Sequence, residues 1–199
     1  MTDRVPGAAW IVVLGLAAAG LTADPAYAQQ EPSLGISFGI GGGVSVPVAS
    51  VRQRFKTGFN GQALMQYDFA EAPFALRAEF SYQSFDLQGP ALKLAGATSG
   101  TGTLLAGVGT LKAYLSRGHV RPYLLAGAGL YTVKIEPDGA GMATRSNARL
   151  GVNGGGGFMF TFGSLSLYTE SRFEHLFVDR AADGVDSIEI VPLTCGVLF

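Results

Sequence analysis

Apolar and polar residues alternate along most of this chain with a period of two. From Leu34 to Val48 the even-numbered positions are mostly Leu, Ile, Phe or Val, whereas the odd-numbered positions are mostly Gly or Ser. Successive side chains of a β-strand point to opposite faces, so this pattern predicts a strand with one apolar face and one small or polar face. The same alternation predicts further strands over residues 58–69, 74–85, 147–162, 165–177 and 190–199.

Two segments in the middle of the chain are less regular. Residues 101–115 place several Leu and Val residues at helical spacing, but their many Gly and Thr residues are poor helix formers, which favours a strand. Residues 122–134 carry apolar side chains on both faces. We therefore predict a strand in each segment and leave open which of its faces is apolar.

The connections between the eight predicted strands alternate in length. The short ones cover residues 70–73, 116–121 and 163–164, and the long ones cover residues 49–57, 86–100, 136–146 and 178–186. Short turns at one rim and longer loops at the other are typical of an up-and-down meander, and a tilted strand of about 10 residues spans a bilayer. The predicted fold is therefore all-β, an eight-stranded antiparallel up-and-down transmembrane β-barrel.

Composition indicates which face of this barrel meets the solvent. Only 15% of the residues are charged, 48% are hydrophobic, and the mean hydropathy is +0.29. A soluble carrier with its apolar face inward would need a more highly charged outer wall, so lipid outside and polar groups inside are favoured. Aromatic rings also gather near predicted strand ends, as they do in interfacial girdles: Phe69, Phe74, Phe162 and Phe199 at the short-turn rim, and Phe59 and Phe177 nearer the loop rim. The alternative is that these rings form the core of a soluble β-sandwich.

The start of the chain is typical of a secretory signal. The apolar run over residues 8–21 is 14 residues long, and a transmembrane helix needs about 20. Ala26 and Ala28 supply the small-x-small pattern of a cleavage site. We expect a signal peptide over residues 1–28 and a barrel domain over residues 29–199; the alternative is an uncleaved anchor helix.

The remaining composition excludes several kinds of site. A single Cys cannot form a disulfide within the chain, and a net charge of −1 provides no basic field for nucleic acid. The Gly-rich runs at residues 41–43 and 154–157 are not followed by the Lys-Ser/Thr of a phosphate loop. With two His and one Cys on separate segments, no zinc spacing is present. We expect no cofactor, no metal and no nucleic-acid partner.

The end of the chain has a pattern of its own. The last ten residues read IVPLTCGVLF, and they place Val191, Leu193, Cys195, Val197 and Phe199 on one face. This ending resembles the terminal strand of bacterial outer-membrane β-barrels, which finishes on an aromatic residue after alternating apolar positions. The resemblance implies that the barrel assembly machinery recognises this segment.

Two internal segments extend the resemblance. Residues 121–131, RPYLLAGAGLY, are similar to the fifth strand of the small outer-membrane protein β-barrel family, which includes the opacity-type surface proteins. Residues 170–173, ESRF, resemble the Glu-x-Arg-aromatic pattern of that family's seventh strand. The resemblance implies a bacterial outer-membrane location, with outer-membrane lipid and lipopolysaccharide as surroundings. It carries little information on activity, because members of the family differ mostly in their loops.

Charged residues on the polar faces of the predicted strands form the clearest candidate site. A charge left unpaired in a dry interior costs several kcal/mol, so these side chains are expected to pair across the lumen. We predict a lumen ion-pair network of Arg77, Glu79, Lys112, Glu170, Arg172 and Glu174. A solid polar core is favoured over a gate or narrow ion path, because eight strands leave room only for side chains.

Catalysis is not expected. His175 has Ser171 nearby in sequence, but residues four apart on one strand lie about 13 Å apart, which is beyond hydrogen-bond reach. The sequence instead favours a structural role in envelope integrity, or adhesion of a host or surface ligand through the loops. The first loop carries Arg52, Arg54 and Lys56, which could meet anionic lipopolysaccharide. The alternatives are a narrow small-solute channel, a lipid A-modifying barrel enzyme and a soluble periplasmic barrel carrier.

Overall fold

The computed structural model describes residues 35–88, 99–137, 145–178 and 187–199. Its strands are β1 (Ile36–Pro47), β2 (Gly58–Asp68), β3 (Phe74–Asp86), β4 (Gly100–Tyr114), β5 (Val120–Pro137), β6 (Arg145–Phe162), β7 (Leu165–Phe177) and β8 (Ser187–Leu198). A short 3-10 helix, η1 (Ala49–Gln53), lies between β1 and β2. Within these described ranges no helix is long and apolar enough to cross a membrane.

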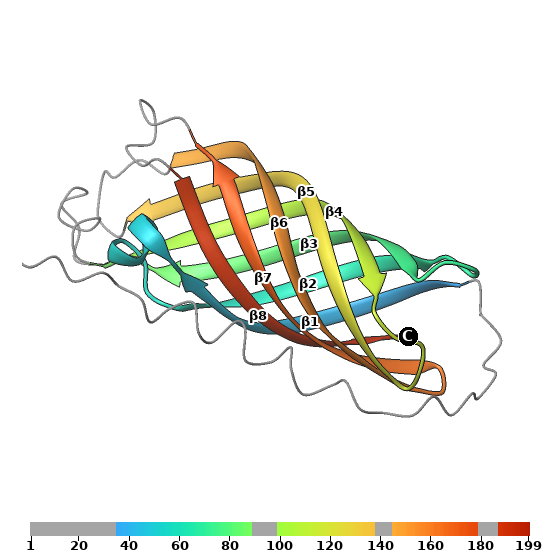
Figure 1. The fold of residues 1–199 in the computed structure, drawn as a ribbon. Coiled ribbons are helices and arrows are strands. Elements are labelled where there is room, and N and C mark those ends of the chain that lie inside the picture. The colour runs from blue at the N-terminus through green and yellow to red at the C-terminus, as the bar shows by residue number, and fades with distance from the viewer. Residues whose placement is uncertain (1–34, 89–98, 138–144, 179–186) are drawn as a thin grey trace, which may run out of the picture. The chain divides into compact units, whose positions relative to one another are not determined.

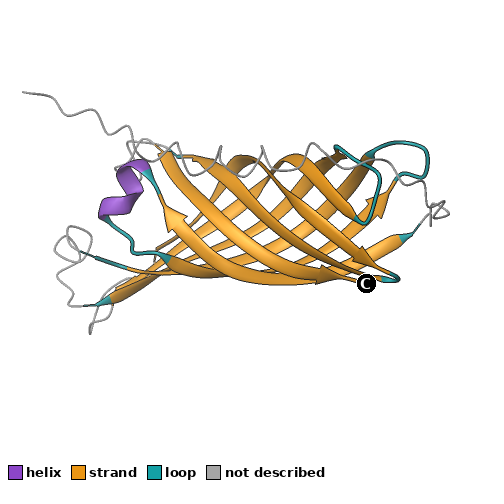
Figure 2. Ribbon diagram, turned by 60° about the horizontal axis from the view of Figure 1, so that its bottom comes forward, coloured by secondary structure: helices purple, strands orange, loops and turns teal. Residues whose placement is uncertain are grey.

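The strands form one closed antiparallel barrel in sequence order (Figure 1). Each strand pairs with the next, and β1 closes the barrel by pairing with β8, so that Ile40 lies between Ala63 and Val197. The predicted eight-stranded antiparallel barrel is confirmed. The short connections 69–73, 115–119 and 163–164 lie at one end with the C-terminus, which we call the turn end; the opposite end, which carries η1, is the loop end (Figure 2).

The structure settles the two strands whose faces the sequence left open. The strand predicted over residues 101–115 is β4 (Gly100–Tyr114), and its even-numbered side chains point into the lumen, with Leu104 and Lys112 buried. In β5 the odd-numbered positions point inward, so that Tyr123 and Tyr131 are buried while Leu130 is exposed. The lumen therefore receives large aliphatic and aromatic side chains from both strands.

The outer wall is apolar. Phe80 in the middle of β3 is 58% exposed and Leu150 of β6 is 65% exposed, as expected of side chains that meet lipid acyl chains. The rings assigned to the girdles are also exposed: Phe59, Phe69, Phe74, Phe162, Phe177 and Phe199. These rings point away from the lumen, which excludes the sandwich-core interpretation.

A charge on this outer wall is expected to be costly in proportion to its depth. We expect Phe80→Arg to lower the free energy of unfolding by about 2–4 kcal/mol, because an arginine at the bilayer midplane loses its hydration. Phe69→Arg, at the turn end of β2, is the matched control and should cost about 0–1 kcal/mol. Urea titration of the barrel folded into lipid vesicles measures both values. Equal losses for the two variants would show that Phe80 does not lie within the hydrocarbon layer.

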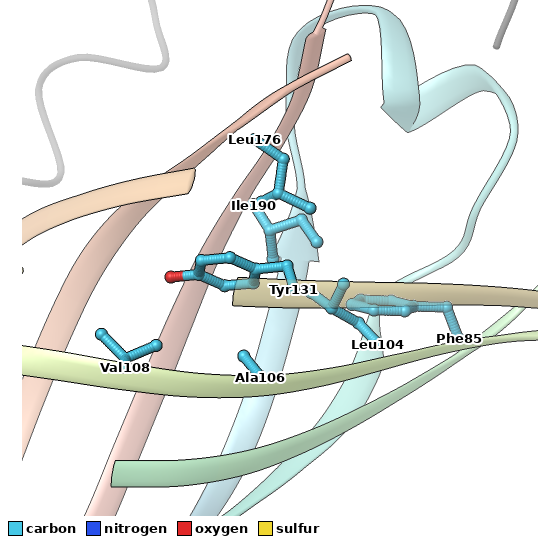
Figure 3. Close-up of a cluster of buried hydrophobic side chains, with 7 residues drawn as sticks. All are labelled: Phe85, Leu104, Ala106, Val108, Tyr131, Leu176 and Ile190. Atoms are coloured by element: carbon cyan, nitrogen blue, oxygen red, sulfur yellow. The ribbon is translucent and has the colours of Figure 1, made fainter. Parts of the chain in front are cut away.

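The expectation of a polar lumen is wrong for both ends of the barrel. At the loop end an apolar cluster fills the interior (Figure 3): Phe85, Leu104, Ala106, Val108, Tyr131, Leu176 and Ile190. At the turn end a second cluster does the same: Leu64, Tyr123, Leu125, Met159, Tyr168 and Leu198. Inward apolar side chains of β4 and β5, such as Leu104 and Leu125, form part of each cluster, and apolar side chains of other strands complete it. Arg77, Glu79, Glu170 and Arg172 lie between the two clusters, and Arg121 reaches the turn-end cluster, with its Nη2 3.2 Å from Met159 Sδ.

Candidate functional site

Four charged side chains from β3 and β7 form a closed ring in the middle of the lumen. Arg77 Nη1 lies 3.0 Å from Glu170 Oε2 and 3.4 Å from Glu79 Oε1. Arg172 donates to both carboxylates, with Nη2 lying 2.9 Å from Glu79 Oε1 and a further bond to Glu170. Two arginines thus alternate with two glutamates, and the ring is formally neutral.

Alternation along the strands brings these four residues together. Arg77 and Glu79 are two apart on β3, and Glu170 and Arg172 are two apart on β7, so each pair points into the lumen. All four are at most 6% exposed. Buried ion pairs are tolerated only when additional hydrogen bonds satisfy the charges. The neighbouring strands provide those bonds.

Neutral side chains of β2 and β5 complete the ring. Gln66 Oε1 accepts from Arg77 Nε and Nη2 at 3.2 and 3.1 Å. Gln62 Nε2 donates to Glu170 Oε1 at 3.0 Å, and the Tyr123 hydroxyl donates to Glu170 Oε2 at 2.8 Å. The sequence interpretation had not singled out these three residues. Their signal was present, because Gln62 and Gln66 lie on the polar face of β2, but Tyr123 lies on a strand whose inward face was unassigned.

Lys112 and Glu174, the other two members of the predicted network, lie outside the ring. Lys112 is fully buried toward the turn end, with Nζ 3.7 Å from the centroid of the Tyr123 ring and 3.5 Å from Gln66 Oε1. Glu174 lies toward the loop end and accepts a hydrogen bond of 2.7 Å from Gln83 Nε2. The positive Lys112 and the negative Glu174 therefore lie on opposite sides of the ring, and neither is a member of it.

The connection between β1 and β2 covers the loop end of the lumen. Val51 of η1 is 3% exposed, and the Phe55 ring packs edge-on against Phe85 at a centroid distance of 6.0 Å. The backbone of this connection is tied to the β3 side, with Lys56 N donating to Asp86 O at 2.9 Å. A small apolar cavity of ≈ 20 Å³ remains beneath it. The first loop therefore helps to close the loop end of the lumen, in addition to being the basic segment that the sequence indicated.

His175 points out of the barrel near the loop end. Its Nδ1 lies 3.4 Å from Glu189 Oε1 on β8, and Ser187 Oγ donates to the same oxygen at 3.2 Å. A nucleophile must hydrogen-bond to its base, whereas the hydrogen bond of this serine goes to the glutamate. Ser171 lies on the same outward face of β7, four residues from His175. A cross-strand partner for His175 does exist, but it is a carboxylate.

The last strand presents its alternate residues to the outside. Leu193, Cys195 and Phe199 are exposed on the outer face, and Cys195 Sγ lies 3.5 Å from Thr169 Oγ1 of β7. Val191 and Val197 share this face and are half-buried by their neighbours. At the chain end, Phe199 and Phe38 exchange two backbone hydrogen bonds of 2.8 and 2.9 Å. The terminal phenylalanine is thus part of the seam that closes the barrel.

The comparisons with known proteins agree with this architecture. The family model described as "Outer membrane protein beta-barrel domain" matches residues 14–186. The chain belongs to this family. It is therefore a bacterial outer-membrane β-barrel protein, which excludes the soluble periplasmic carrier. No curated protein sequence matches the chain.

Solved structures of outer-membrane barrels have the same fold. Neisserial surface protein A aligns with a TM-score of 0.58 at 15% identity, over 82% of this chain and 94% of its own. A major outer membrane protein from Thermus thermophilus aligns with a TM-score of 0.52 at 11% identity, over 83% of this chain and 99% of its own. At these identities the similarity establishes the fold alone.

Proposed function

We propose that this outer-membrane protein is a closed scaffold, and that its role in envelope integrity or surface adhesion is carried by the connections at its loop end. The observation that supports the proposal is the filled lumen. The ion ring lies between two apolar clusters, and the cavities beside the ring and beneath the first loop measure only ≈ 10 and ≈ 20 Å³. A wall of eight strands leaves little room beyond that taken by its own side chains. A rigid barrel with variable loops is a common way to present a binding surface.

The same geometry disfavours the other functions. A narrow solute channel would require water to pass both apolar clusters and the ring. A lipid A-modifying enzyme would require a nucleophile hydrogen-bonded to His175, and the Ser187 hydroxyl is bonded to Glu189 instead. We infer that the protein acts by binding and by supporting the membrane rather than by catalysis.

We infer the export and the assembly of the protein from its sequence. Residues 1–28, including the cleavage positions Ala26 and Ala28, lie outside the described residues, and we propose that they direct export and are removed. The outward face of β8, which ends at Phe199, would be the segment that the assembly machinery recognises. At the loop end, the exposed Arg52 and Lys56 would meet the anionic groups of lipopolysaccharide.

Shortening the loops tests the proposed role. We expect that replacing residues 89–98, 138–144 or 179–186 with a short Gly-Ser connection leaves barrel folding intact. At least one replacement should reduce cell adherence or raise the sensitivity of the envelope to detergent, because the barrel itself offers no open site. Replacing residues 70–73 at the turn end is the matched control, and it should change neither property. Wild-type behaviour of all three loop variants in both assays would contradict the proposal.

A further inference from the structure

Three polar side chains interrupt the lipid-facing wall near the loop end, where β7 meets β8. His175 of β7 pairs with Glu189 of β8, and Ser187 lies two residues before Glu189 on the same outward face. The neighbouring side chains are apolar: Val152 of β6, which pairs with His175 from the other side, and Phe173 are both exposed. Ionisable side chains are rare on a surface that faces lipid, and where they occur they commonly mark a functional site.

The contacts of Glu189 fall on one of its two carboxylate oxygens. His175 Nδ1 lies 3.4 Å from Glu189 Oε1, and Ser187 Oγ donates to the same oxygen at 3.2 Å. Among the described residues no further side-chain hydrogen bond or ion pair is found for this carboxylate, so Oε2 has no donor there. Because Nδ1 faces the carboxylate, a neutral imidazole carries its proton on Nδ1, and Nε2 is left as an acceptor. The two side chains, which are 32% and 23% exposed, therefore offer acceptors to a molecule beside the wall.

The height of these side chains on the wall determines which molecules can reach them. The Phe177 ring packs edge-on against the His175 ring at a centroid distance of 5.2 Å, and Phe177 is exposed. Exposed aromatic rings near strand ends lie at the boundary between the hydrocarbon layer and the lipid headgroups. In outer-membrane barrels the longer connections are extracellular, so the loop end faces the outside of the cell. His175 and Glu189 are therefore level with the headgroups of the outer leaflet.

We propose that His175, Ser187 and Glu189 form a lateral binding site for the sugar headgroup of an outer-leaflet glycolipid. Two sugar hydroxyls donate to Glu189 Oε2 and His175 Nε2, and Ser187 holds the carboxylate in place through Oε1. A phosphate group is disfavoured, because its oxygens are acceptors and its negative charge is repelled by Glu189. The site therefore differs in chemistry from the exposed Arg52 and Lys56 of the first loop, which suit anionic groups.

Nuclear magnetic resonance of the histidine rings tests the site, because the two histidines of the chain lie at opposite ends of the barrel. His175 belongs to the site, and His119, on the exposed connection between β4 and β5, is an internal control. The folded barrel, labelled with ¹⁵N-histidine, is placed in phosphatidylcholine nanodiscs that contain a rising fraction of monoglucosyldiacylglycerol at fixed pH. The phosphatidylcholine headgroup has no hydrogen-bond donor, and the glucosyl lipid adds hydroxyls without adding charge. We expect a saturable shift of the His175 signals and no saturable shift of the His119 signals.

Variants of Glu189 assign the shift to the site. Glu189→Leu suits a lipid-facing strand and should abolish the saturable shift. Glu189→Gln, which also serves if the leucine variant does not fold, should need a several-fold higher glycolipid fraction for half-saturation. Glu136→Gln is the matched control, because this exposed carboxylate near the loop end is paired with Lys134, and it should behave as the wild type.

The remaining outcomes of this titration contradict the proposal. A wild-type His175 signal that does not respond to the glucosyl lipid would overturn it, since the side chains would then be hydrated only. An equal response of wild type, Glu189→Leu and Glu189→Gln would overturn it as well, because the lipid would then bind elsewhere. Phosphatidylethanolamine should have little effect, because Glu189 repels the phosphate beside its ammonium group. A response to this lipid equal to that of the glucosyl lipid would contradict the assignment to a sugar headgroup.

Discussion

Replacing Arg172 with Met is expected to lower the free energy of unfolding by about 3–5 kcal/mol. Arg172 is bonded to both glutamates of the ring, so its loss leaves Glu79 and Glu170 to share the single guanidinium of Arg77. These carboxylates are at most 6% exposed and cannot be rehydrated without opening the lumen. Urea titration, followed by the difference in gel migration between boiled and unboiled samples, measures the change.

An exposed ion pair on the same barrel provides the control. Lys134 Nζ lies 2.7 Å from Glu136 Oε1 near the loop end, and both side chains are more than two-fifths exposed. Such surface pairs contribute about 0–1 kcal/mol, so Lys134→Met should be nearly neutral. Adding Glu79→Gln to Arg172→Met should recover part of the lost stability, because the second change removes an uncompensated charge. A loss below about 1 kcal/mol for Arg172→Met would show that the ring does not hold the lumen together.

Replacing Gly157 of β6 with Val is expected to be strongly destabilising. A Cβ at this inward position would overlap the carbonyl oxygen of Thr169 on β7 and would approach the Tyr123 hydroxyl to 2.8 Å. Overpacking costs about 1–3 kcal/mol, and displacing the hydroxyl that donates to Glu170 adds about 1–3 kcal/mol. The expected sum of about 2–6 kcal/mol should remove most of the fast-migrating folded band on unboiled gels.

An outward glycine offers the same substitution without the clash. Gly109 of β4 is exposed on the outer wall, and a Cβ there meets no heavy atom within 4 Å. Gly109→Val should therefore fold with wild-type yield, since valine suits a strand and a lipid-facing position. Equal folding of the two valine variants would mean that the Tyr123 layer is not packed as described. Loss of folding in both would point to an effect on strand backbone rather than on the lumen.

The fold could be predicted because alternation with a period of two specifies both the strand and its faces. In β3, for example, Phe80 and its even-numbered neighbours are apolar, and Arg77 and Glu79 are not, so the barrel wall and the charged layer follow from one pattern. The pattern is ambiguous where both faces are apolar. That ambiguity in β4 and β5 concealed their inward aliphatic side chains, which form part of the two apolar clusters.

The candidate site was predictable in its residues but not in its contacts. Sequence places Glu170, Arg172 and Glu174 on one face of β7, yet their distances to β3 depend on how the two strands face each other across the lumen. Only the three-dimensional structure shows that Glu174 meets Gln83 and that Lys112 meets the Tyr123 ring. The packing of Val51 and Phe55 into the loop end of the lumen could not be predicted either, because a short helix in a loop shows no repeating hydrophobic pattern in the sequence.

Single-channel recording tests the closed lumen most directly. The wild-type protein, shown to be folded by its migration on unboiled gels, would be inserted into planar lipid bilayers in concentrated KCl beside a large porin as a positive control. We expect no discrete current steps from the wild type at protein amounts where the porin opens, because both apolar clusters and the ion ring block the path. Reproducible steps of one size from freshly inserted wild-type barrels would contradict a closed lumen and would favour the channel instead.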